Sequence, residues 1–112
     1  MELVRGDIVI CAPPGDYGKP RPAVVMQSDL FNATHSSLVI CPITSHLEDA
    51  PLFRIPVAPG ITTGLNVRSQ VMVDKIIAIP RSKIARPVGA IGARTLKEVE
   101  EALRLWLDLV SR

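Results

Sequence analysis

Apolar residues in the first four-fifths of the chain are arranged as in β-strands. Runs rich in Val and Ile, bounded by Pro, Gly, Asn and Asp, predict strands over residues 5–12, 21–27, 37–43, 53–58 and 69–79. Some runs are continuous rather than alternating, as in residues 23–26. Continuous runs are typical of strands covered on both faces, and here a helix or a partner subunit would supply the second cover.

Near the C-terminus the apolar spacing changes to three and four residues, which predicts a helix. The stripe consists of Leu96, Val99, Leu103, Trp106 and Val110. Thr95 and Glu98 match a capping box, in which the side chain of each residue accepts a hydrogen bond from the backbone N–H of the other. The helix is therefore expected to start there. Ala102, Leu105, Leu107 and Leu109 widen the apolar surface beyond one contact. We therefore expect one side to pack on the strands and another on a second copy of the chain.

Short strands with short connections and one terminal helix define the expected fold class. It is mainly β (α+β): a small SH3-like antiparallel β-barrel with a C-terminal α-helix, formed as a single domain by residues 1–112. Residues 13–20 contain three prolines and two glycines and must form a loop. Loops of this length in a small domain are often functional.

Composition narrows the class of protein. The chain is 47% apolar and 21% charged, which argues against disorder. A formal net charge of +2 does not identify a nucleic-acid binder, but the acidic residues gather late in the chain, which leaves a basic face elsewhere. There is no signal pattern and no apolar run near the roughly 20 residues of a membrane span, so we expect a cytoplasmic protein without membrane contact.

Cys11 and Cys41 each lie inside an apolar run. Both are interpreted as buried, reduced thiols. No His or Cys stands at metal-ligand spacing, so neither a metal nor another cofactor is expected.

Three places carry candidate chemistry. Arg21 follows the Pro/Gly loop, where a guanidinium can grip phosphate, although a solvated Arg is favoured from position alone. Thr44, Ser45 and His46 end a strand and could donate to an oxyanion, although a Thr-Ser turn is the commoner explanation. Asp74 interrupts an apolar run together with Lys75, where a bulge or strand break is equally expected.

Histidine is the usual proton-transfer residue in metal-free RNA cleavage. His35 lies in a polar turn and is expected to be exposed, whereas His46 is closer to the candidate site. Residue types alone therefore predict a fold and an anion-binding site, but they do not predict a particular reaction.

Four segments in order resemble the MazF/PemK family of toxin–antitoxin ribonucleases, over essentially the whole chain. Residues 5–9 (RGDIV) resemble its first strand, and residues 18–29 (GKPRPAVVMQSD) resemble its second-strand signature. Residues 41–45 (CPITS) are similar to the third motif, and residues 64–65 with 69–76 (SQVMVDKI) to the fourth. Each is weak alone, and the ordered set is fairly specific.

The resemblance implies that Arg21 and Thr44 are the principal catalytic pair. The implied reaction is metal-free attack by an RNA 2′-hydroxyl on its neighbouring phosphate, leaving a 2′,3′-cyclic phosphate and a 5′-hydroxyl end. Because the phosphorane gains negative charge, a fixed cation and a hydroxyl donor stabilise it selectively. The need for a 2′-hydroxyl spares DNA.

Further residues are expected to bind substrate. They are Lys19, Tyr17, Gln27, Ser45, His46 and Asp74. Tyr17 would stack on a base, although packing on the barrel is as plausible. Some family members place an Arg two residues before the Asp that matches Asp74 and give that pair acid and base roles; this chain has Met72 there, so Asp74 is expected to position substrate instead. Ser28 replaces the usual Asn.

The resemblance also implies partners: single-stranded RNA as substrate, a second copy in a homodimer, and a cognate MazE-like antitoxin whose flexible tail blocks the groove. Two alternatives stay open. CcdB-like toxins share the fold and poison DNA gyrase through a terminal Trp-Gly-type tail, whereas Trp106 here is inside the helix. The other alternative is an inert barrel that only binds a partner, against which Arg21 and Thr44 both argue.

Overall fold

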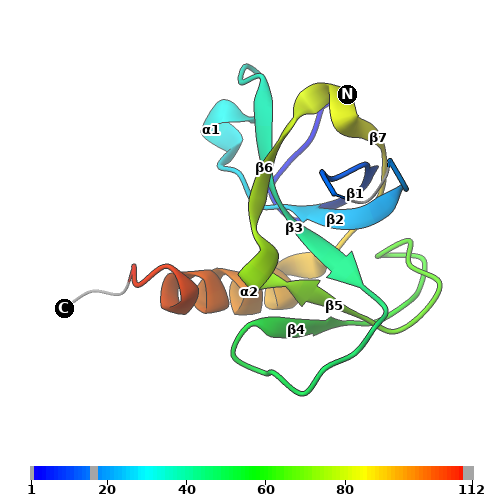
Figure 1. The fold of residues 1–112 in the computed structure, drawn as a ribbon, viewed down its shortest axis with the longest axis vertical. Coiled ribbons are helices and arrows are strands. Elements are labelled where there is room, and N and C mark those ends of the chain that lie inside the picture. Colours follow the sequence, from blue (N-terminus) through cyan, green and yellow to red (C-terminus); the bar gives the residue numbers. More distant parts are fainter. Residues whose placement is uncertain (1, 16–17, 110–112) are drawn as a thin grey trace.

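The chain folds into a strongly bent antiparallel sheet with one long helix, as the computed structural model shows for residues 2–15 and 18–109 (Figure 1). The strands are β1 (Asp7–Cys11), β2 (Arg21–Val25), β3 (Ser37–Thr44), β4 (Arg54–Val57), β5 (Ser69–Met72), β6 (Ile77–Pro80) and β7 (Ile84–Ala90). The helices are α1 (Asp29–Asn32) and α2 (Gly92–Trp106), with 3-10 turns η1 (Val73–Lys75) and η2 (Arg81–Lys83). The expected mainly β fold with a C-terminal helix is confirmed.

The strand order is β4-β5-β3-β2-β1-β7, and β3 is the strand around which the sheet bends. Residues 37–40 of β3 pair with β6, whereas Ile43 and Thr44 pair with β5. One strand therefore joins the upper strands of Figure 1 to the lower pair, β4 and β5. The C-terminal end of β3 is where the two parts meet, and it carries Thr44.

Two apolar clusters lie on opposite faces of the central strands, so residues next to one another in sequence enter different clusters. Ile8 and Val24 pack with Val99, Ala102 and Leu103 of α2. Their neighbours in sequence enter the second cluster; they are Val9, Ala23 and Val25. The continuous apolar runs are thus explained within one chain, with α2 as the cover of one face.

The predicted strand over residues 69–79 is wrong as a single element. It is two strands, β5 and β6, separated by η1 at the polar pair Asp74 and Lys75. The expected strand break is therefore confirmed. The 3-10 turn redirects the chain, so that β5 pairs with one half of β3 and β6 with the other.

The five predicted strands omit β7, and the prediction also omits α1. Pro87 and Gly89 obscure β7, because both residues are depleted in strands. β7 lies at the edge of the sheet, where a residue without an N–H is tolerated, and its pairing with β1 contains register shifts.

The expected capping box at Thr95 is wrong. α2 begins at Gly92, and its N-cap is Ile91, which has no side-chain capping bond. Gly92 has φ +81°, which turns the chain out of β7, and Ile91 is buried in the core. Thr95 and Glu98 consequently lie inside the helix. Val110, the last residue of the predicted stripe, lies outside the described residues.

Cys11 and Cys41 are both buried free thiols, as expected. Burial raises the pKa of Cys11 to about 11. Burial, with a smaller contribution from the Asp74 charge, raises the pKa of Cys41 to about 12. Both therefore stay protonated at neutral pH. Among the described residues, no helix is long and apolar enough to span a bilayer.

Candidate active site

A groove of about 880 Å³ lies where the ends of β2, β3 and β5 meet. Arg21, Thr44, Ser45, His46, Met72 and Lys75 are among the side chains that line it, and Ile10, Pro22, Pro42, Ile43, Leu65, Val67 and Ile77 give it an apolar floor and walls. The loop over residues 13–15 and the segment over residues 64–67 form its rims. Polar donors above an apolar floor suit a ligand that has both phosphates and bases.

The pairing of β2 with β3 brings Arg21 and Thr44 together. Ala23 lies opposite Pro42 in this antiparallel pair. The paired residues end at this position; Arg21 lies two residues beyond it along β2 and Thr44 two residues beyond it along β3, so both are at the same end of the two strands. Both side chains line the groove. Arg21 also pairs with Cys11 of β1, which fixes the start of β2.

The Thr44 hydroxyl is oriented by the turn that follows β3. Its Oγ1 accepts a hydrogen bond from the His46 backbone N–H at 3.0 Å. A hydroxyl that accepts from the backbone still has its own hydrogen to donate. The Thr-Ser turn and the oxyanion donor are therefore compatible interpretations of the same residues.

Gln70 fixes the segment beyond this turn. Its side-chain amide accepts from the Glu48 N–H at 3.0 Å and donates to the Glu48 C=O at 2.8 Å. Gln70 is itself the β5 partner of Thr44. The turn that carries Thr44, Ser45 and His46 is thus tied to the sheet at both ends.

The segment over residues 64–67, one rim of the groove, is held against β7 by close contacts at two glycines. A Cβ on Gly64 would lie 2.2 Å from the Val88 carbonyl oxygen, and Gly64 has φ +73°. A Cβ on Gly89 would lie 2.4 Å from the Thr63 backbone. The Ala90 N–H donates to Thr62 O at 2.9 Å. Only glycine permits this close backbone approach.

The charged side chains that line the groove, within the described part of the chain, are cations. They are Arg21 and Lys75, and the imidazole of His46 also lines the groove. No Asp or Glu among the described residues is part of the lining. A groove lined by charge of one sign attracts ligands of the opposite sign. This local balance indicates an anionic ligand despite the small net charge.

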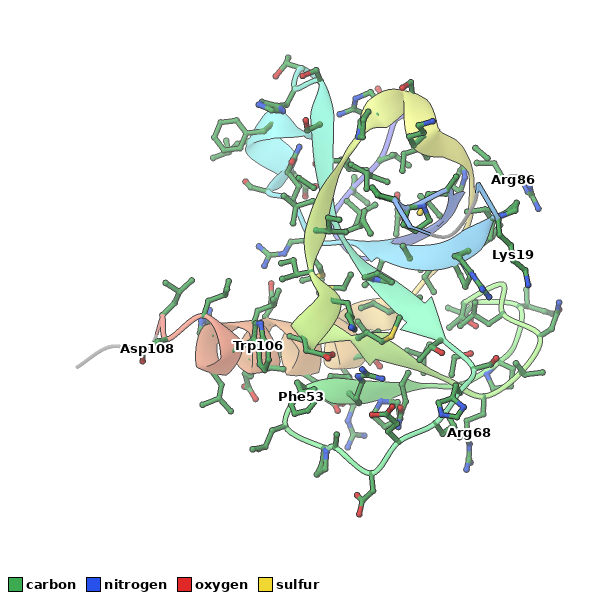
Figure 2. All side chains as sticks on the ribbon, viewed as in Figure 1. Lys19, Phe53, Arg68, Arg86, Trp106 and Asp108 are labelled. Atoms are coloured by element: carbon green, nitrogen blue, oxygen red, sulfur yellow. The ribbon has the colours of Figure 1, made fainter. Side chains whose placement is uncertain are left out.

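The predicted substrate-binding residues do not all lie in the groove. Ser45 and His46 line it. Lys19 is exposed and projects outward near the start of β2 without lining the groove (Figure 2). Gln27 is bonded to the backbone of β3, donating to Ser37 O and accepting from the Val39 N–H. Tyr17 lies outside the described residues.

Asp74 also lies away from the groove lining, in a two-point ion pair with Arg54. Nε and Nη2 of Arg54 donate to the two carboxylate oxygens at 2.9 and 3.1 Å. The hydrogen bond to Asp74 is the main cause that raises the pKa of Arg54, so the guanidinium stays charged. Sequence reasoning missed Arg54, because nothing local links it to a residue twenty positions later. It noted Lys75 only as part of a polar interruption.

The fold and groove define the class: a small mainly β protein with a bent antiparallel sheet, one C-terminal helix and a cationic groove. The solved structure of Mycobacterium tuberculosis toxin MazF-mt6 has the same fold, with a TM-score of 0.81, 24% identity and coverage of 94% of this chain and 99% of that chain. The MazE–MazF complex of Deinococcus radiodurans (Form-I) gives a TM-score of 0.78 at 25% identity, over 96% and 98% of the two chains.

Sequence comparison identifies the family. The model of the PemK-like, MazF-like toxin of type II toxin–antitoxin systems matches residues 4–107. "Probable endoribonuclease MazF" of Mycolicibacterium smegmatis is 40% identical over 106 residues, which cover 94% of this chain and 96% of that protein. The chain belongs to the PemK/MazF family of type II toxin–antitoxin toxins.

Proposed function

We propose that this MazF-like toxin cuts single-stranded RNA in the groove between β2, β3 and β5, with Arg21 and Thr44 as its catalytic pair. The endoribonuclease activity follows from the family and from a relative at 40% identity that is named as an endoribonuclease. The observation that supports the catalytic pair is that Arg21 and Thr44, at the same end of the paired strands β2 and β3, both line a groove whose charged side chains, among the described residues, are cations.

In the proposed reaction the 2′-hydroxyl of one nucleotide attacks its own 3′-phosphate. The P–O2′ bond forms and the P–O5′ bond breaks, leaving a 2′,3′-cyclic phosphate and a 5′-hydroxyl end. Arg21 neutralises the added charge on phosphorus and supplies the proton to the leaving 5′-oxygen. Solvent water takes up the proton released by the 2′-hydroxyl and returns a proton to Arg21. Thr44 donates its free hydroxyl hydrogen to a non-bridging oxygen, because its oxygen already accepts from the His46 N–H. Arg21 and Thr44 would together provide this stabilisation without a metal ion.

Contacts to the rest of the RNA are assigned to the groove. Ser45 and His46 lie next to the catalytic threonine and would bind the flanking nucleotides. Lys19 is placed to attract a phosphate outside the groove. Gln27 and Asp74 are held by protein partners, so we propose no direct RNA contact for either.

The proposal includes two macromolecular partners besides RNA. The Deinococcus radiodurans toxin of similar fold is crystallised as a MazE–MazF complex, and we expect a MazE-like antitoxin here. An acidic, flexible tail suits a cationic groove with apolar walls. We propose a homodimer because α2 leaves large apolar side chains exposed beyond its contact with the sheet. We propose that it acts in the cytoplasm, where its RNA substrate is found.

The direct test is cleavage of a long RNA by the purified toxin in EDTA, with the fragment ends mapped. We expect discrete cuts with 5′-hydroxyl ends, and none in Arg21→Ala. Gyrase-dependent DNA breaks without RNA cleavage would favour the CcdB-like alternative. No effect on either substrate, in a preparation that still binds its antitoxin, would indicate an inert binding module.

A further inference from the structure

Lys75 and the buried ion pair behind it form a second feature of the groove. Lys75 ends η1 and lines the same groove as Arg21 and Thr44, yet it stands in a turn that the strand pattern explains only as an interruption. The residue before it, Asp74, faces the opposite way, to Arg54. The charged pair Arg54–Asp74 therefore lies directly behind Lys75, a cation of the groove.

The pair is well buried and geometrically defined. Arg54 is 8% exposed, and the Asp74 side chain is 15% exposed. Their two hydrogen bonds form the planar, two-point contact that a guanidinium makes with a carboxylate, and such a contact fixes orientation as well as distance. Glu48 approaches the same guanidinium at 3.7 Å and is half exposed.

η1 is anchored at successive residues to Phe53 and to Arg54, the first residue of β4. The Val73 N–H donates to Phe53 O at 3.0 Å, and the Val73 side chain is fully buried. Asp74 is then bound by Arg54, the residue after Phe53. Arg54 is also the β4 partner of Met72, which lines the groove. With Val73 held by Phe53 and Asp74 by Arg54, the turn has Met72 and Lys75 on either side, and both line the groove.

We infer that Lys75 is a second phosphate-binding cation of the RNA groove and that the Arg54–Asp74 pair is the device that positions it. This inference rests on the proposed function. Arg54 and Asp74 are positioning residues, because they contact Lys75 only through η1. The polar break in the apolar run is thereby explained: the strand is interrupted so that a lysine enters the groove from a fixed turn. The ligand is the RNA phosphodiester backbone, at a phosphate other than the scissile one.

The test measures binding of a 2′-O-methyl oligonucleotide that spans a mapped cleavage site, over a range of salt concentrations. Each phosphate contact to a single strand contributes about 0.7 to the slope of log affinity against log salt. Lys75→Met should weaken binding about tenfold at low salt and reduce that slope by about 0.7. Lys75→Arg should keep the slope.

The matched control is Lys83→Met, because Lys83 ends the other 3-10 turn, η2, and does not line the groove. It should bind as the wild type does. An unchanged salt slope in Lys75→Met, with wild-type binding and cleavage intact, would overturn this inference and leave the proposed function standing. A wild-type chain that neither binds nor cuts RNA would overturn both.

The positioning role is tested by a double-mutant cycle. Asp74→Asn should weaken RNA binding in the wild-type chain but add almost nothing in the Lys75→Met background. Arg54→Met/Asp74→Leu replaces the pair with apolar side chains, leaves no lone buried charge, and should behave in the same way. Thermal unfolding confirms that each variant is folded. Equal losses in the two backgrounds would show that the pair does not act through Lys75.

Discussion

Single hydrogen bonds fix what the reactive side chains can do. Thr44 accepts from the His46 N–H, and its hydroxyl hydrogen is available to donate to a ligand. Thr44→Ser should therefore retain much of the cleavage rate, whereas Thr44→Val should lower kcat by about 10²- to 10³-fold, as loss of an oxyanion donor does. Steady-state cleavage of a short RNA measures both. Equal rates for the valine variant and the wild type would remove Thr44 from the mechanism.

The two buried thiols make stability depend on alkaline pH. Their folded pKa values are about 11 and 12, against an ordinary value of 9.0. Above pH 9 the unfolded chain loses thiol protons that the folded chain keeps, so stability present below pH 9 falls as pH rises toward the folded values. Each thiol should remove roughly 1 kcal/mol between pH 9 and 10.

Urea unfolding at pH 8 and pH 10 tests this effect. The wild-type chain should lose more stability over that interval than the Cys11→Ala/Cys41→Ala variant, since the latter lacks both thiols. The variant has the same lysines, whose titration is thereby controlled. An identical pH dependence in the two proteins would contradict the assignment.

At the scale of elements, residues 60–67, a segment that includes the groove residues 64–67, pack closely against β7. Gly89→Ala should push this segment from the sheet, because the new Cβ would meet Thr63 at 2.4 Å, and cleavage should fall at least tenfold. Gly92→Ala is the control: its Cβ meets nothing, but φ +81° is strained for alanine.

The two variants should separate activity from stability. Gly92→Ala should lower the melting temperature and leave cleavage by the folded fraction unchanged. Gly89→Ala should lose cleavage even well below its melting temperature. Full activity in Gly89→Ala would mean that the 60–67 segment does not shape the groove.

The strands that could be predicted from sequence are those whose Val and Ile residues enter the core. β7 could not, because Pro87 and Gly89 are depleted in strands and only Ile84 of β7 is buried in the core. The start of α2 was misplaced because the Gly92 turn, and not a capping side chain, begins the helix.

Within the site, the strand-end residues Arg21, Thr44, Ser45 and His46 could be identified from motif and position, and the structure places all four in one groove. The partner of Asp74 could not be identified, because Arg54 lies on another strand. Lys75 carried one signal, a polar pair inside an apolar run, but its direction depends on that same distant pairing.

At the scale of the whole molecule, the proposed homodimer would form through the exposed apolar surface of α2. Leu105 is 55% exposed, and Trp106 packs against Phe53 with ring centroids 5.5 Å apart (Figure 2). Leu105→Lys should convert the dimer to a monomer in light-scattering measurements at micromolar concentration, because a charge would be buried in the interface. Loss of the dimer should not unfold the protomer.

Leu30→Lys provides the matched control. Leu30 is 84% exposed on α1, away from α2, and its replacement should leave the dimer intact. Dissociation by Leu30→Lys and not by Leu105→Lys would move the interface to α1.

Arg21 and Thr44 are proposed to stabilise the same negatively charged phosphorane. Single-turnover cleavage of a short RNA by Arg21→Ala, Thr44→Val and the double variant tests it most directly, alongside binding of a 2′-O-methyl strand. We predict losses of at least 10²-fold in the cleavage step for each single variant, a double variant little worse than the poorer single one, and RNA binding reduced far less. Unchanged cleavage in either single variant, or losses confined to binding, would contradict the account.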